Sequence, residues 1–115
     1  MPMKKFINDP KNLTKELLEG FAIAHSEVVA LKSEKTVCRA QPKPASKVAL
    51  VTLGGAGHEP ALSGFVGEGA LDYSVVGDIF AAPGAMSSCV TIIRTLRFSF
   101  LAICIAMLAL MTSPA

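Results

Sequence analysis

A glycine-rich segment that ends in a histidine is the part of this sequence best suited to chemistry. Residues 53–60 read Leu-Gly-Gly-Ala-Gly-His-Glu-Pro. Glycines let the backbone adopt positive φ and let a ligand approach the backbone N–H groups directly. The imidazole of His58 can donate a hydrogen bond to a hydroxyl or carbonyl group or accept one from a hydroxyl. The segment can therefore hold an oxygen-rich ligand.

Two other interpretations of this segment have to be weighed. Its spacing is not G-x-G-x-x-G and no Gly-Lys-Ser/Thr follows, so neither the dinucleotide fingerprint nor the P-loop is matched. A purely structural role stays open, in which His58 and Glu59 satisfy each other or nearby backbone groups at a strained turn. Glu59 precedes Pro60 and fits the start of a helix better than catalysis.

The flanking segments predict an α/β fold. Residues 47–53 form an apolar, β-branched run, typical of a strand buried on both faces. Residues 59–66 predict a short helix, and residues 73–80 a second buried strand. Open α/β sheets bind ligands at the carboxyl ends of their strands, where His58 is expected to lie. Asp78, near the end of the second strand, is interpreted as a turn or cap residue or as a site carboxylate.

An amphipathic helix is predicted before these strands. Its apolar positions recur at three- and four-residue intervals, with Asn12 or Thr14 as a cap, and Gly20 costs it about 1 kcal/mol relative to alanine. Residues 36–39 predict a short strand and residues 41–46, with two prolines, a loop. The apolar positions of the helix are Leu13, Leu17, Leu18, Phe21, Ala24 and Val28.

Composition narrows the function classes. A chain of 115 residues suffices for one small domain. Eleven Lys plus Arg against nine Asp plus Glu, without a basic stripe, argue against a nucleic-acid partner. Three cysteines without C-x-x-C spacing indicate neither a disulfide framework nor a metal site. The N-terminus lacks the apolar run of a secretory signal, so a reducing, cytoplasmic location is expected.

Four sequence blocks carry a family resemblance. In order and spacing they resemble the N-terminal part of the K subunit, or K domain, of dihydroxyacetone (glycerone) kinase, over about the first 85 residues. The resemblance implies an incomplete open sheet with flanking helices, the N-terminal part of the K-domain fold, in residues 1–85. The blocks are Phe-Ile-Asn-Asp-Pro at 6–10, Gly-Gly-Ala-Gly-His-Glu-Pro at 54–60, Gly-Phe-Val-Gly-Glu-Gly at 64–69 and Gly-Asp-Ile-Phe-Ala-Ala-Pro at 77–83.

The resemblance also implies a function and a site. The family's K domain holds a short-chain ketose such as dihydroxyacetone, while ATP-Mg on an L subunit or domain, or a phosphotransferase relay, supplies the phosphoryl group. No cofactor is then bound by this chain, and its partners are the ketose, the L component and a second copy in a homodimer. Leu53 and Ala56 depart from the Gly and Ser that the family often has. The implied binding residues are Gly54, Gly55, Gly57 and His58, supported by Thr52 at the strand end.

The resemblance implies no catalytic residue in this chain. Family kinases trap the ketose covalently on a downstream histidine and use a downstream aspartate as base. The only other histidine here is His25, on the predicted helix, where a partly solvated or core-edge role is expected. The chain alone is therefore expected to be inactive.

Residues 86–115 form a hydrophobic tail in which the resemblance stops. Three interpretations are open: a truncated kinase ending in a frameshift product that would aggregate, a membrane anchor through residues 90–111, and a helix packed into the soluble fold. The alternatives to a kinase acceptor-binding part are a non-catalytic ketose-binding regulatory module and a small membrane-tethered protein. Four-carbon ketoses offer the same carbonyl and hydroxyl pattern as dihydroxyacetone.

Overall fold

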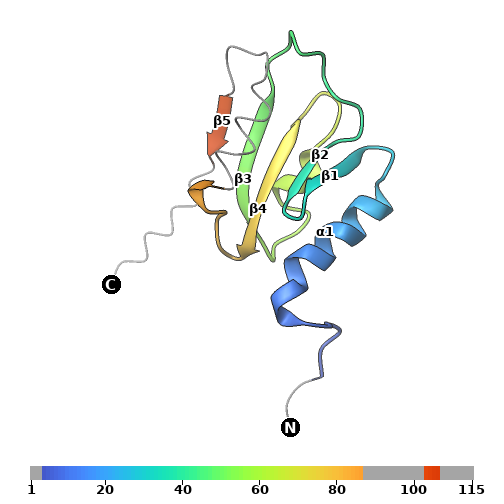
Figure 1. The fold of residues 1–115 in the computed structure, drawn as a ribbon, viewed down its shortest axis with the longest axis vertical. Coiled ribbons are helices and arrows are strands. Elements are labelled where there is room, and N and C mark those ends of the chain that lie inside the picture. The colour runs from blue at the N-terminus through green and yellow to red at the C-terminus, as the bar shows by residue number, and fades with distance from the viewer. Residues whose placement is uncertain (1–3, 87–102, 107–115) are drawn as a thin grey trace.

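The computed structural model describes residues 4–86 and 103–106. Over these residues the fold is an open sheet with an α-helix against it (Figure 1). Its five strands have the order β1-β2-β4-β3-β5, so that the two strands around the glycine-rich segment, β3 and β4, are neighbours. The predicted α/β class and open sheet are confirmed.

The helix α1, Leu13–Ala24, is confirmed but is shorter than predicted. Asn12 occupies the N-cap position without a side-chain hydrogen bond; the preceding 3-10 turn η1, Pro10–Asn12, is instead capped by Asp9. Leu18 is buried in the core, whereas Val28 lies beyond the helix and is 46% exposed. The apolar residues continue past the end of α1 because the first strand begins at Val29, and the sequence pattern does not separate the two elements.

Gly20 offers a test of the helix that involves no other part of the chain. A Cβ at this position would meet nothing within 4 Å. Gly20→Ala is therefore expected to raise the free energy of unfolding by roughly 0.5–1 kcal/mol, measured by urea denaturation. Gly69→Ala is the matched control: it also has open space but a φ of +77°, so it should destabilise. A destabilised Gly20→Ala would contradict the placement of this residue inside α1.

The strands meet in a mixed sheet. A hairpin of β1, Val29–Ser33, and β2, Thr36–Arg39, pairs through β2 antiparallel with β4, Tyr73–Ile79. Strand β4 is parallel to β3, Leu50–Ala56, and β3 is parallel to β5, Ile103–Ala106. The strands predicted at 36–39 and 73–80 are confirmed, except that Phe80 lies outside β4.

Strand β3 differs from its prediction at both ends. It begins at Leu50 and runs through Gly54 and Gly55 to Ala56, so the first two glycines of the segment are strand residues. Gly54 still pairs with Val76 of β4, and the register becomes irregular only between Gly54 and Ala56. The turn therefore starts later than the glycines suggested.

The predicted helix at 59–66 is only a 3-10 turn, η2, Leu62–Phe65. The N–H of Gly64 donates to the carbonyls of both Pro60 and Ala61, and a glycine inside so short a helix disfavours its extension. A Cβ at Gly64 would also lie 2.8 Å from Cβ of Pro60, so the turn is packed tightly against its own start.

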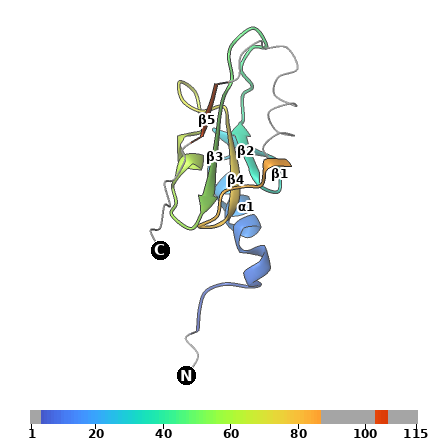
Figure 2. The same ribbon diagram turned by 90° about the vertical axis from the view of Figure 1, so that its left-hand side faces the viewer.

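The hydrophobic core lies between α1 and the sheet. Figure 2 shows the sheet edge-on. The core is small and consists mainly of valines, in keeping with a sheet of β-branched residues. Phe21, Leu31 and Leu71 pack around it. The buried residues that form it are Leu18, Val29, Val37, Ala56, Val66 and Val76.

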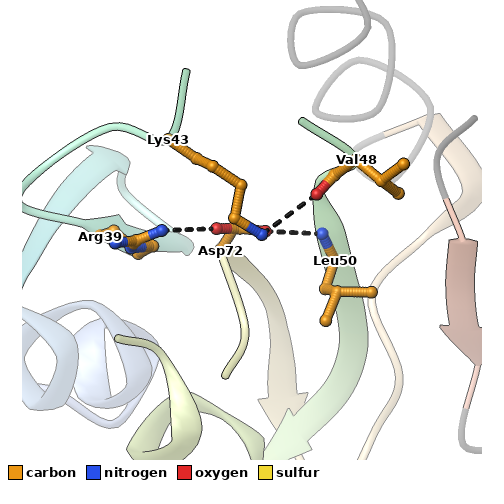
Figure 3. Close-up of polar contacts among 5 residues, drawn as sticks. All are labelled: Arg39, Lys43, Val48, Leu50 and Asp72. Atoms are coloured by element: carbon orange, nitrogen blue, oxygen red, sulfur yellow. Dashed lines mark hydrogen bonds and ion pairs between the residues drawn. The ribbon is translucent and has the colours of Figure 1, made fainter. Parts of the chain in front are cut away.

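A buried carboxylate ties the loop before β3 to the amino end of β4 (Figure 3). Asp72 is 3% exposed; its Oδ1 accepts from Arg39 Nη1 at 3.1 Å, and its Oδ2 accepts from Lys43 Nζ and from the Leu50 N–H, both at 2.7 Å. Burial by itself would raise the pKa of Asp72, but the hydrogen bonds from Lys43, Leu50 and Arg39 together lower it. Lys43 also donates to the carbonyl of Val48. The predicted loop is thus held by a specific cluster.

The tail is described only at Ile103–Ala106, which is a strand on the outer edge of β3 and not the helix that two of the interpretations required. The rest of the tail lies outside the described residues, and so does almost all of the predicted anchor at 90–111. The division of the chain at residue 85 stays a prediction. Over the described ranges, 4–86 and 103–106, no helix has both the length and the apolar character needed to cross a membrane.

Candidate functional site

The structure places His58 two residues beyond the end of β3, as predicted. Gly57 precedes it with a φ of +100°, a conformation that side chains rarely adopt. Positive φ was predicted for the glycine cluster as a whole, but Gly54 and Gly55 are extended residues of β3. Of the three glycines assigned to binding, Gly57 is therefore the one whose backbone shape demands glycine.

Gly54 and Gly55 are explained by close packing within the chain. A Cβ at Gly54 would lie 2.8 Å from Cδ1 of Leu62, and one at Gly55 would lie 2.9 Å from the backbone nitrogen of Ala81. Each glycine thus admits another segment of the protein, η2 in one case and the chain after β4 in the other. This packing accounts for both glycines without a ligand.

His58 and Glu59 have separate surroundings. The Glu59 carboxylate turns back and accepts from the Gly57 N–H, at 3.1 and 3.2 Å to its two oxygens. The His58 side chain is exposed, and its ring lies 6.1 Å from that of Phe80, with 29° between the ring planes. The purely structural role therefore applies to Glu59, whose carboxylate holds the turn. His58 instead faces solvent beside an aromatic ring.

Thr52 and Asp78, the two other residues considered for the site, differ in their exposure to solvent. Thr52 lies in the middle of β3 and is 2% exposed, so the prediction that it supports the site from the strand end is wrong. Asp78 is on the surface, paired with Lys35, and its carbonyl accepts from the Ala81 N–H. Asp78 thus has the turn role that was one of its two interpretations.

A cavity of about 510 Å³ opens between α1, η2, the end of β3 and the first half of β4. It shares Gly54, Gly55 and Glu59 with the glycine-rich segment, but His58 is not part of its wall. Its polar lining includes Ser63 and Ser74, whose hydroxyl oxygens are 3.2 Å apart. The remaining lining is mostly apolar: Leu17, Leu18, Gly20, Phe21, Ala24, His25, Pro60, Ala61, Leu62 and Val76.

Sequence reasoning missed both serines and the contribution of His25 to a cavity wall. His25 follows the last residue of α1, its ring lies 5.1 Å from that of Phe21 in a tilted arrangement, and it contributes to the cavity wall. Ser74 could have been noticed as a polar residue inside a buried strand, but its meeting with Ser63 depends on the fold. Within residues 4–86 and 103–106, no three His, Cys, Asp or Glu side chains form a group that could hold a metal ion.

Comparison with known families decides the relationship of this chain. The family model described as the Dak1 domain matches residues 19–100. The chain belongs to the Dak1 domain family. The match includes α1 from Glu19, the glycine-rich segment and β4, and it runs past residue 85. The resemblance drawn from the four sequence blocks is thereby confirmed.

Kinases of short ketoses are among the most similar members of the Dak1 domain family. The dihydroxyacetone-binding subunit of the PTS-dependent dihydroxyacetone kinase of Lactococcus lactis is 39% identical over 83 residues, which are 72% of this chain and 25% of that protein. The D-erythrulose kinase of Mycolicibacterium smegmatis is 46% identical over 83 residues, 72% of this chain and 14% of that protein. These relatives favour the kinase interpretation over the regulatory-module and membrane-tethered alternatives.

The fold agrees with a solved structure of the Dak1 domain family. The crystal structure of the dihydroxyacetone kinase of C. freundii, in its native form, superposes with a TM-score of 0.73 and 31% identity. The superposition covers 90% of this chain and 19% of that one. The chain thus spans a quarter or less of the length of these relatives, and its sheet is part of a dihydroxyacetone kinase fold.

Proposed function

We propose that this chain forms part of the ketose-binding portion of a dihydroxyacetone kinase. The observation that carries the proposal is the exposed His58, which directly follows the positive-φ Gly57 at the carboxyl end of β3. This is the edge where open α/β sheets bind ligands. The L. lactis relative, 39% identical, is by its name the dihydroxyacetone-binding subunit of its kinase.

The proposal gives each of the four predicted binding residues its own role. Because Glu59 already engages the Gly57 N–H, Gly57 contributes the shape of the turn. The ketose contacts then fall to the Gly55 backbone and the His58 imidazole, which can hydrogen-bond to the ketone oxygen and a hydroxyl. Gly54 lets β3 pack closely against η2 and so shapes the proposed ketose site. The chain's role in this proposal is to bind and orient the acceptor.

The phosphoryl donor belongs, in this proposal, to a partner. ATP-Mg on an L subunit or domain, or a phosphotransferase relay, would meet the bound ketose at this edge of the sheet. Phosphoryl transfer depends mainly on positioning and charge stabilisation, so an acceptor subunit serves by fixing one hydroxyl. The acceptor class extends to four-carbon ketoses, since the M. smegmatis relative is a D-erythrulose kinase. In this proposal the chain acts in the cytoplasm.

Calorimetric titration with dihydroxyacetone tests this function. The full chain should release measurable heat, and His58→Ala should weaken binding about tenfold, or roughly 1.4 kcal/mol, through loss of one hydrogen-bonding group. The control is Lys32→Ala, which removes an exposed side chain on β1 in the hairpin away from the site and should leave the affinity unchanged. Absence of heat for the unaltered chain, or equal affinities for it and His58→Ala, would refute the proposal.

A further inference from the structure

Phe80, directly after β4, combines two properties that are unusual together. Its φ is +52°, in the left-handed region that large aromatic residues avoid, and the residue is 73% exposed. An exposed ring gains little from burial, so packing in the core does not compensate for the strained backbone. Strain of this kind is concentrated at functional sites, where the surrounding structure holds it in place.

The hydrogen bonds around Phe80 explain its backbone conformation, but they do not explain why an aromatic residue occupies this position. The Phe80 N–H donates to the Ala56 carbonyl at 2.7 Å, which ties the end of β4 to the end of β3. The Ala81 N–H donates to the Asp78 carbonyl at 3.1 Å and closes a tight reversal of the chain. Glycine or asparagine would adopt this reversal with less strain than phenylalanine.

The Phe80 ring lies against the proposed ketose site at Gly57 and His58. A Cβ at Gly57 would come within 3.3 Å of Cε1 and Cζ of Phe80, so the ring covers the turn residue. The same ring faces the His58 imidazole at 6.1 Å and 29°, within the range of stacked aromatic pairs. Phe80 thus touches the residue that shapes the turn and faces the residue assigned to hydrogen bonding.

We propose that Phe80 is a positioning residue that orients His58 for the ketose. An exposed imidazole on a turn would otherwise sample several rotamers, and only some of them direct a ring nitrogen toward the ketose. The Phe80 ring restricts these rotamers and forms an apolar wall beside Gly57. The inference rests on the proposed function, since it names what fixes the imidazole at the same site.

Replacement of Phe80 in the full chain should separate binding from stability. Phe80→Gly and Phe80→Asn relieve the backbone strain, so their urea midpoints should equal or exceed that of the unaltered chain. Their affinity for dihydroxyacetone should nevertheless fall roughly three- to tenfold. Phe80→Tyr keeps the ring and should restore the affinity. Phe65→Ala removes another exposed phenylalanine, on η2, and should change neither quantity.

A second measurement follows the imidazole itself. The Hα–Hβ couplings of His58, measured by NMR, should report one dominant χ1 rotamer in the unaltered chain and in Phe80→Tyr, and averaging over several rotamers in Phe80→Gly and Phe80→Asn. Unchanged His58 couplings, or unchanged affinity in both strain-relieving variants, would overturn the proposal. If the unaltered chain binds no dihydroxyacetone, the proposed function fails, and the His58 couplings still decide whether Phe80 positions the imidazole.

Discussion

Gly77→Ala is expected to lower the free energy of unfolding by about 3 kcal/mol or more, because backbone atoms occupy the place of its Cβ. That Cβ would lie 2.0 Å from the Ala81 oxygen, 2.6 Å from the Ala82 carbonyl carbon and 2.7 Å from the Pro83 nitrogen. A flexible side chain could move aside, but this segment is anchored by the hydrogen bond from Phe80 to Ala56. Relief of the clash would therefore separate the ends of β3 and β4.

The urea midpoint measures this effect, and Gly84→Ala is its control. Gly84 lies in the same part of the chain, but a Cβ there would meet nothing within 4 Å, so its stability should stay close to that of the unaltered chain. If Gly77→Ala were as stable as Gly84→Ala, the chain after β4 would not fold back over Gly77. The packing of Ala81 against Gly55 and the placement of Phe80 beside Gly57 would then be contradicted as well.

Asp72→Ala is expected to destabilise the chain by about 3 kcal/mol, the lower end of the range for breaking a buried ion pair. The substitution leaves Arg39 and Lys43, both partly buried, without their anion and leaves the Leu50 N–H without its acceptor. Figure 3 shows these groups converging on the one carboxylate. Asp78→Asn, which breaks the exposed pair with Lys35, should have little effect. Equal effects of the two substitutions would contradict the central role of Asp72.

The same cluster predicts how stability depends on pH. Because the pKa of Asp72 is lowered in the folded chain, its stabilisation is present above the ordinary carboxyl pKa and is lost as pH falls through the lower, folded-state value. The urea midpoint should therefore fall between roughly pH 5 and pH 3, and Asp72→Ala should show a smaller fall over this range. Identical pH profiles for the two proteins would contradict the lowered pKa.

Local sequence patterns predicted the secondary structure well where one signal dominated. The β-branched runs at 36–39 and 73–80 became strands, and the apolar period before Ala24 became α1. The errors came from contacts between distant residues. Gly54 was assigned to a turn because glycine favours turns, but pairing with Val76 keeps it in β3.

The site was predictable only in part for the same reason. His58 at a strand end follows from the order of strand, glycines and histidine, which are adjacent in the sequence. The approach of Phe80 to His58 requires β3 and β4 to be parallel neighbours, and the cluster around Asp72 joins residues 22 to 33 positions apart. No local spacing encodes such meetings, so neither Phe80 nor Asp72 could be recognised as important before the fold was known.

Chemical-shift mapping tests the central claim most directly. Dihydroxyacetone is titrated into the ¹⁵N-labelled full chain, and the backbone amide shifts are followed. A ketose site at the end of β3 predicts that the largest changes fall on Gly55, Gly57 and His58, with Phe80 close behind and the hairpin of β1 and β2 unaffected. Shifts confined to α1 and η2, on the other walls of the cavity, or the absence of any shift at millimolar ketose, would contradict it.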